Sequence, residues 1–156
     1  MIVAGVMSGT SADGIDVALV EFSPGPKSTR RAASRKTAAG SSHPGKAAPP
    51  PVPTPLQFRG HAELPYPADV RRLVLASMNS PRASVADLAR LNFLLGDLYA
   101  EAVLSAQKRL KLKVDLVGCH GQTLYHQGRL ATFLGRQLAV TWQAGDGSRM
   151  AVKLGV

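Results

Sequence analysis

The chain has 156 residues, 45% of them hydrophobic, which is typical of a folded domain and not of a disordered chain. Its formal net charge of +9 is concentrated in residues 23–59, which hold seven basic residues and no acidic one, so the remainder has 12 basic against 10 acidic residues, about +2. The single cysteine, Cys119, excludes an internal disulfide bond and a cysteine-rich zinc site, and it fits a reducing compartment.

The first predicted element is a buried strand at residues 2–7, an apolar run rich in β-branched residues that ends in a polar turn. This run is too short for a membrane span and lacks the basic start of a signal peptide, so we expect a cytoplasmic protein with no membrane partner. Residues 15–22 alternate apolar and polar side chains, which predicts a second strand. A glycine-containing loop therefore joins two strands.

This loop has the groups that a polyphosphate needs. Gly9 and Gly14 allow the backbone to approach a ligand, Thr10 and Ser11 add hydroxyl donors, and nearby carboxylates could hold the hydrated magnesium ion that accompanies ATP. The segment is neither a P-loop nor a dinucleotide fingerprint, because it lacks Gly-Lys-Ser/Thr and no helix follows. A simple hairpin turn made of ordinary turn residues is the alternative, and both interpretations stay open.

Residues 23–55 form a low-complexity insertion rich in proline, serine and basic residues. Eight of the eleven prolines lie here, with almost no large apolar side chain. Such a segment cannot bury enough surface to offset its ordering entropy, so we predict a disordered insertion that acts as a solvated linker. A basic arm that binds nucleic acid is an alternative that we do not expect, because no aromatic residue for base stacking appears before Phe58.

Two helices are predicted next, at residues 69–78 and from Ser84 onward, where the spacing of Ser84 and Asp87 resembles a capping box. Asn92 and Tyr99 flank the apolar stripe of the second helix. An amide beside a buried stripe is usually a structural hydrogen-bonding group, although Asn92 could also orient sugar hydroxyls. The stripe consists of Leu88, Leu91, Leu95, Leu98 and Ala102.

Two further strands, at residues 114–119 and 138–142, are each expected to end in a polar loop, and a short helix at 148–155 ends at a glycine. This order predicts an α/β domain with its site at the strand ends. In the first loop, His120, Gln122 and Thr123 could bind a sugar, or the histidine could simply bond a backbone carbonyl. In the second loop, Asp146 could contact a ligand or cap the final helix.

A thiol nucleophile formed by Cys119 beside His120 is the remaining chemical hypothesis from the residues alone. Adjacent residues of a strand point to opposite faces, so this pairing is not favoured. The four histidines of the chain have no spacing that predicts a metal site.

Three segments, 7–16, 119–126 and 141–147, closely resemble the corresponding blocks of the anhydro-N-acetylmuramic acid kinase family, as do Leu91-Asn92 and Leu95-Gly96. The resemblance covers most of the chain outside 23–55. It implies an α/β fold, an incomplete actin-like lobe of the sugar kinase and Hsp70-type ATPase kind that carries the disordered basic insertion, with residues 1–156 as its amino-terminal portion.

The resemblance further implies ATP-dependent phosphorylation of 1,6-anhydro-N-acetylmuramic acid at O6 with opening of the anhydro bridge, a step of peptidoglycan recycling. ATP and magnesium would be the cofactors and the sugar the small-molecule partner. Asp13 and Asp16 would be the metal-binding residues. The sugar-site residues would be Asn92, His120, Gln122 and Gln143, and the ATP-binding residues would be Gly9, Thr10, Ser11, Ala12, Asp13, Gly14, Ile15 and Asp16.

No catalytic residue is assigned, because the general base of the family lies in an Asp-Phe-Arg segment that would follow Val156. We therefore expect a truncated family member that is inactive alone. The alternative is a non-catalytic phosphate- or nucleotide-binding module, or an interaction protein that uses its basic arm. A homodimer of the family type stays open.

Overall fold

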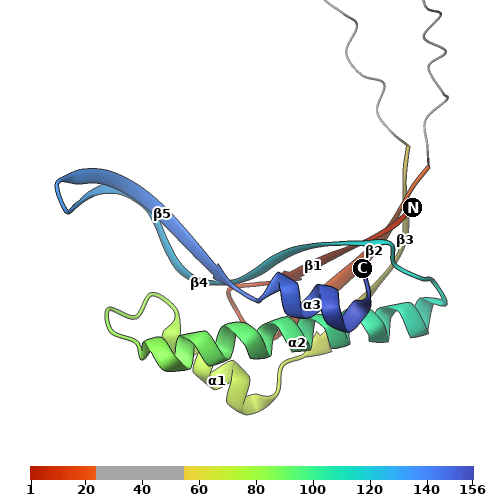
Figure 1. Cartoon of the computed structure of the whole chain (residues 1–156), viewed down its shortest axis with the longest axis horizontal. Helices are drawn as coiled ribbons and strands as arrows, with labels where there is room; N and C mark the ends of the chain where they lie inside the picture. Colours follow the sequence, from red (N-terminus) through yellow and green to blue (C-terminus); the bar gives the residue numbers. More distant parts are fainter. Residues whose placement is uncertain (24–54) are drawn as a thin grey trace, which may run out of the picture.

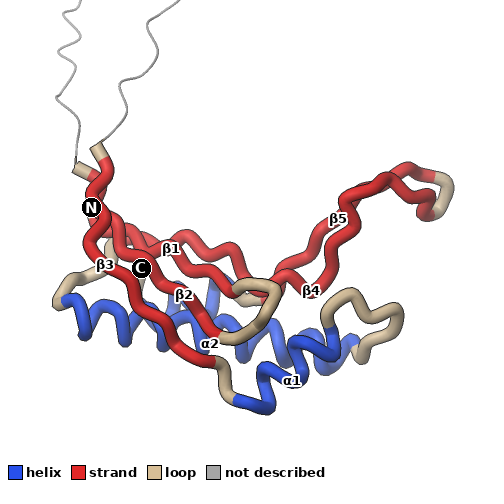
Figure 2. Tube along the Cα trace, turned by 180° about the vertical axis from the view of Figure 1, so that it is seen from behind, coloured by secondary structure: helices blue, strands red, loops and turns tan. Residues whose placement is uncertain are grey.

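The computed structural model describes residues 1–23 and 55–156 as two layers, a five-stranded sheet with helices on one face (Figures 1 and 2). The sheet has the order β3-β2-β1-β4-β5. The strands are β1 (Ile2–Ser8), β2 (Gly14–Phe22), β3 (Leu56–Pro65), β4 (Leu116–Phe133) and β5 (Arg136–Ala144). The helices are α1 (Ala68–Ser77), α2 (Val85–Leu110) and α3 (Gly147–Leu154).

The sheet is mixed, and its connections follow from its strand directions. Strands β1, β2 and β3 pair antiparallel in chain order, and β4 pairs antiparallel with β5. Strand β4 lies parallel to β1. Parallel neighbours need a crossover connection, and α1 and α2 supply it. The mixed α/β class expected from the sequence is therefore confirmed.

The core lies between the sheet and α2. Alternate residues of β1 and β2 face the helices and are buried, as the period of two predicts. The predicted stripe of α2 is confirmed: Leu91, Leu95 and Ala102 are buried, and Leu88 and Leu98 are partly buried against them. Tyr99, expected only to flank the stripe, is fully buried. The core residues from β1 and β2 are Ala4, Val6, Ile15, Val17 and Leu19.

The structure corrects three expectations. Strand β3 was not predicted, although Leu56, Phe58, Ala62 and Leu64 alternate with polar residues; only Ala62 of its ten residues is buried. Residues 120–123, expected as a loop, lie within β4, which continues to Phe133. Residues 14–16 begin β2, so the loop after β1 spans only residues 9–13.

Strands β4 and β5 extend beyond the rest of the sheet as a two-stranded arm that no helix covers (Figure 2). The register of β4 against β1 shifts between Val6 and Ser8, where Gly121 has a positive φ of 75°. Strand β4 thus leaves β1 and follows β5 alone. The exposed apolar side chains of the arm are Tyr125, Leu130, Phe133, Leu134, Leu138, Val140 and Trp142.

Several helix ends lie where the sequence predicted them. The Ser84 hydroxyl accepts a hydrogen bond from the Asp87 N–H at 3.3 Å, and Asp146 accepts one from the Arg149 N–H at 2.9 Å. Gly155 ends α3 in the left-handed conformation, with φ 69°. None of the helices in the described part of the chain is long and apolar enough to cross a membrane.

The predicted disordered insertion at 23–55 lies outside the described residues except at its two ends. These ends meet, because the Ser23 N–H donates to the Pro55 carbonyl at 3.4 Å and Phe22 pairs with Leu56. The insertion therefore connects two neighbouring antiparallel strands.

Candidate functional site

The loop between β1 and β2 presents hydrogen-bond donors at its surface. The Ala12 N–H donates to the Gly9 carbonyl at 3.1 Å and closes a turn, while Thr10 and Ser11 are exposed. The N–H groups of Thr10, Ser11 and Asp13 make no hydrogen bond within the described residues. Free N–H groups and exposed hydroxyls on one short turn suit an anion such as a phosphate.

The backbone strain of this loop does not lie at its glycines. Ala12 has φ 50°, a left-handed conformation that costs an L-residue energy, and its side chain is fully buried. Gly14 lies in β2, where an added Cβ would approach the Leu64 carbonyl oxygen to 2.9 Å. Gly14 therefore allows β3 to pack closely against β2, a role that the sequence analysis did not assign to it.

Arg71 of α1 contacts the loop, and the sequence analysis missed it. Its Nη2 donates to the Asp13 carboxylate at 2.9 Å and to the Ser11 carbonyl at 3.3 Å. Hydrogen bonds from Ser11 and Arg71 hold the pKa of Asp13 below its ordinary value, so this exposed carboxylate stays ionised. No local signal marks Arg71, because 58 positions separate it from Asp13.

Asp16 has a different partner. Its carboxylate lies 2.9 Å from Nε2 of His61 on β3, and Glu63 is its direct cross-strand neighbour. Asp13 and Asp16, both expected to bind magnesium, are thus held in separate contacts. Among the described residues no group of three or more His, Cys, Asp or Glu could hold a metal ion. A magnesium ion would therefore take most of its ligands from phosphate and water, which is its usual preference.

Gln122 is fully buried and lies behind the loop. Its Oε1 accepts a hydrogen bond from the Ser8 hydroxyl at 2.6 Å, and its Nε2 donates to the Gly9 and Thr123 carbonyls, each at 3.4 Å. Both of these carbonyls are acceptors only, which fixes the orientation of the amide. A direct contact between Gln122 and a sugar would require these bonds to break.

The other expected sugar-site residues lie around the same end of the sheet. His120 is exposed on β4, and its Nδ1 lies 3.1 Å from the Gly121 carbonyl oxygen. Gln143 of β5 is the partner of Thr123 and donates to the Thr141 hydroxyl at 2.7 Å. The structure therefore brings β1, β4 and β5 residues together at this end.

Asn92 of α2 supports the end of β5. Its Oδ1 accepts a hydrogen bond from the Gly145 N–H at 2.8 Å, and its carbonyl accepts one from the Asp146 N–H at 3.0 Å. The structural interpretation of Asn92 is confirmed. Its amide nitrogen makes no hydrogen bond within the described residues, so a donor is still available to a ligand.

Two buried tyrosines connect these elements. The hydroxyls of Tyr66, just after β3, and Tyr99 of α2 lie 3.2 Å apart. The Tyr66 hydroxyl donates to the Tyr99 oxygen, and burial is the main cause that raises the pKa of each phenol, so both stay protonated. The ring of Tyr99 packs against Gly145 and leaves no room there for a Cβ.

Two minor hypotheses are also resolved in part. Desolvation raises the pKa of the Cys119 thiol, which disfavours the thiolate that a nucleophile requires. Asp146 caps α3, and its hydrogen bonds with Ser148 and the Arg149 N–H lower the pKa of its carboxyl. The capping interpretation of Asp146 is thus confirmed.

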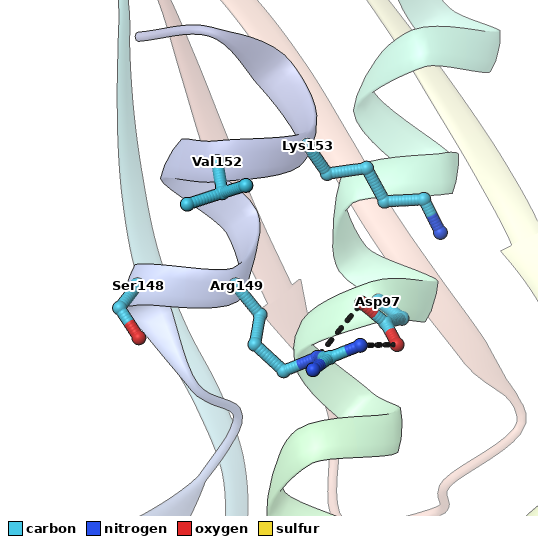
Figure 3. Close-up of a pocket in the computed structure, with 5 residues that line it drawn as sticks. All are labelled: Asp97, Ser148, Arg149, Val152 and Lys153. Atoms are coloured by element: carbon cyan, nitrogen blue, oxygen red, sulfur yellow. Dashed lines mark hydrogen bonds and ion pairs between the residues drawn. The ribbon is translucent and has the colours of Figure 1, made fainter.

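One surface pocket lies away from the loop. This pocket of about 400 Å³ lies between α2 and α3 (Figure 3). Inside it, Arg149 forms a double hydrogen bond with Asp97, at 3.0 and 2.6 Å, so its charge is already neutralised. None of the predicted site residues lines this pocket, and we assign no ligand to it.

Comparison with known proteins gives one consistent family. A sequence model of the family described as anhydro-N-acetylmuramic acid kinase matches residues 53–156. Proteins with that name from Caldanaerobacter subterraneus subsp. tengcongensis and Salinibacter ruber are 30% and 34% identical to this chain, over 99% of it. A third, from Bacillus cereus strain Q1, is 32% identical over 94% of the chain.

The aligned part covers 34%, 33% and 32% of these three relatives, respectively. The chain therefore spans about a third of the length of the curated relatives it matches. The family model begins after the loop at residues 9–13, but the two alignments over 99% of the chain include that loop.

Proposed function

The chain belongs to the anhydro-N-acetylmuramic acid kinase family, and from this membership we propose that it contributes the phosphate-binding part of an ATP-dependent sugar kinase. The proposed reaction is phosphorylation of 1,6-anhydro-N-acetylmuramic acid at O6 with opening of the anhydro bridge, in peptidoglycan recycling. The proposed fold is an actin-like lobe.

One observation carries this proposal. The turn at residues 9–13 joins two adjacent strands and leaves three backbone N–H groups and the Thr10 hydroxyl without partners in the described part of the chain, while the Ser11 hydroxyl bonds to Asp13. An ATP phosphate accepts hydrogen bonds from several such donors at once. Arg71 lies at the same turn, where it is paired with the Asp13 carboxylate.

Most of the predicted site residues have a proposed role. ATP, with magnesium, supplies the phosphoryl group when it is bound. Residues 9–13 hold its phosphates, and Asp13 and Asp16 orient the hydrated metal ion. His120, Gln143 and the free amide nitrogen of Asn92 would face the sugar, because they lie at the same end of the sheet as the loop.

The 156 residues alone are proposed to bind ATP without turning it over. Positioning between two lobes and a general base supply most of the rate in phosphoryl transfer. Within the described residues, Asp13, Asp16 and Asp146 already bond to Arg71, His61 and the α3 backbone, respectively. Each of these carboxylates has a structural partner, and we assign none of them as the general base.

Equilibrium dialysis of MgATP against the purified chain tests this proposal. We expect saturable binding that weakens roughly tenfold in Thr10→Val, because a hydroxyl donor to a charged phosphate is lost. Thr132→Val, the same change on the distant arm, should leave binding unchanged. Absence of binding would refute the nucleotide site, and ATP-dependent phosphorylation of the anhydro sugar by the chain alone would refute the predicted inactivity.

A further inference from the structure

We propose that Gln122 is a positioning residue that holds the loop at residues 9–13 from behind, and that it reaches the ligand only through Ser8 and Gly9. This inference rests on the proposed phosphate-binding function of the loop. It differs from the expectation that Gln122 itself contacts the sugar.

The contacts of Gln122 all run to the loop or to its own strand. Its 2.6 Å bond to the Ser8 hydroxyl is short, and the Ser8 oxygen also lies 3.2 Å from the Gly14 carbonyl oxygen. Ser8 and Gly14 are the residues immediately before and after the loop. A single buried pair therefore contacts both ends of the turn and, through the Gly9 carbonyl, its first residue.

Burial of Ser8 and Gln122 favours a single position of the loop. Gln122 is 0% exposed and Ser8 is 5% exposed, and each is polar. A buried donor or acceptor that loses its partner costs more than an ordinary hydrogen bond contributes, so alternative loop positions that break the pair are disfavoured. Within the described residues no buried side-chain polar atom lacks a partner, which agrees with a fully satisfied contact.

The same contact joins the loop to the sugar side of the site. Gln122 lies on β4 between His120 and Thr123, and Thr123 pairs with Gln143 of β5. It sits where the register of β4 against β1 shifts, so its side chain faces Ser8. Gln122 therefore connects the phosphate loop to the strand that carries His120 and pairs with the strand of Gln143.

Hydrogen exchange of the 156-residue chain, without nucleotide, tests this role. The probe is the Ala12 amide, which closes the loop turn, and the reference is the Val103 amide in the core of α2. We expect Gln122→Met and Ser8→Ala each to speed exchange of Ala12 by roughly tenfold and to leave Val103 nearly unchanged. Gln137→Met on the exposed arm is the matched control and should change neither amide.

A double variant separates a direct contact from two independent effects. If the two side chains act through each other, the double variant speeds Ala12 exchange no more than the stronger single variant. Multiplied effects in the double variant, or equal acceleration of Ala12 and Val103, would overturn the proposal. Ser8→Thr restores the hydroxyl and should restore the protection of Ala12, and this comparison decides the question if Gln122→Met does not fold.

Nucleotide affinity gives the functional readout. MgATP should bind Ser8→Ala and Gln122→Met with a dissociation constant raised by a similar factor, although neither residue touches the ligand. If the unmodified chain binds no ATP, the proposed function fails, whereas the exchange data still decide whether Gln122 holds the loop. If binding is unchanged while Ala12 exchange accelerates, the positioning role is overturned.

Discussion

At the scale of single residues, the loop at 9–13 depends on side chains that come from elsewhere in the sequence. Arg71 approaches it from α1 and Gln122 from β4. Both bond to backbone carbonyls of the loop, which leaves its N–H groups available. The pKa of Asp13 is lowered by hydrogen bonds from Ser11 and Arg71, and only the second of these partners lies beyond local sequence.

The ion pair of Asp13 and Arg71 gives a pH prediction. Hydrogen bonds from Ser11 and then Arg71 hold the folded pKa of Asp13 below its unfolded value of about 3.9, so the contribution of these contacts to stability is present above that pH. It is lost as the pH falls through the folded pKa. Arg71→Met should raise the pKa of Asp13 toward its ordinary value, measured by a carboxyl NMR titration.

Arg90→Met is the control for this titration, because Arg90 forms an exposed pair with Asp87 on α2 and should not affect Asp13. Both substitutions should change the free energy of unfolding only slightly, since exposed ion pairs contribute little. The same midpoint for Asp13 in the parent chain and in Arg71→Met would contradict the assigned cause.

At the scale of elements, α3 packs against α2 through one close backbone approach and two ion pairs. A Cβ at Gly96 would lie 2.6 Å from the Asp146 carbonyl oxygen. Lys153 bonds to Glu101 at 2.7 Å, and Arg149 bonds to Asp97 and lies 5.4 Å from the centre of the Phe93 ring. The glycine therefore sets how near the α3 amino terminus can come to α2.

Gly96→Ala should destabilise the protein even though alanine favours helices. Alanine ordinarily stabilises a helix interior by about 1 kcal/mol relative to glycine, but here the methyl group would collide with backbone. We expect a net loss of about 1–3 kcal/mol in the free energy of unfolding, measured by urea titration. Separation of α3 from α2 should follow.

Gly147→Ala is the matched control, because a Cβ at this first residue of α3 meets no atom within 4 Å. It should be neutral or slightly stabilising. A stable Gly96→Ala protein would mean that the two helices can move apart at little cost.

At the scale of the whole molecule, residues 24–54 join two strand ends that already lie side by side. Replacing them with Asn-Gly, a sequence suited to two-residue hairpins, should preserve the fold. The free energy of unfolding should stay the same or rise, because a shorter connection loses less entropy on closure. Thermal unfolding followed by circular dichroism measures this.

The same deletion separates the proposed kinase role from a basic-arm interaction. The deletion removes six of the seven basic residues of 23–59, whereas the loop at residues 9–13 is untouched. MgATP binding should therefore persist. A deletion that abolished MgATP binding but left the fold intact would contradict the assignment of the site to the loop.

Much of the architecture could be predicted from local sequence. The strand-loop-strand start, the buried stripe of α2, the Ser84 and Asp146 caps and the Gly155 end of α3 all follow from short-range periodicity and turn chemistry. The continuation of β4 could not be predicted this way. Strand β3 could have been predicted, because Leu56, Phe58, Ala62 and Leu64 alternate with polar residues, although as an edge strand it buries only Ala62.

The sequence by itself determined the family and which faces of β1, β2 and α2 are apolar, because these features depend on residues close together along the chain. It also provided the basis for proposing a phosphate-binding loop. Only the tertiary structure decided that Gln122 lies behind the loop, that Arg71 lies on Asp13 and that Asp16 pairs with His61. These contacts join residues 45 to 114 positions apart, and no local pattern encodes which distant side chain will meet a given group.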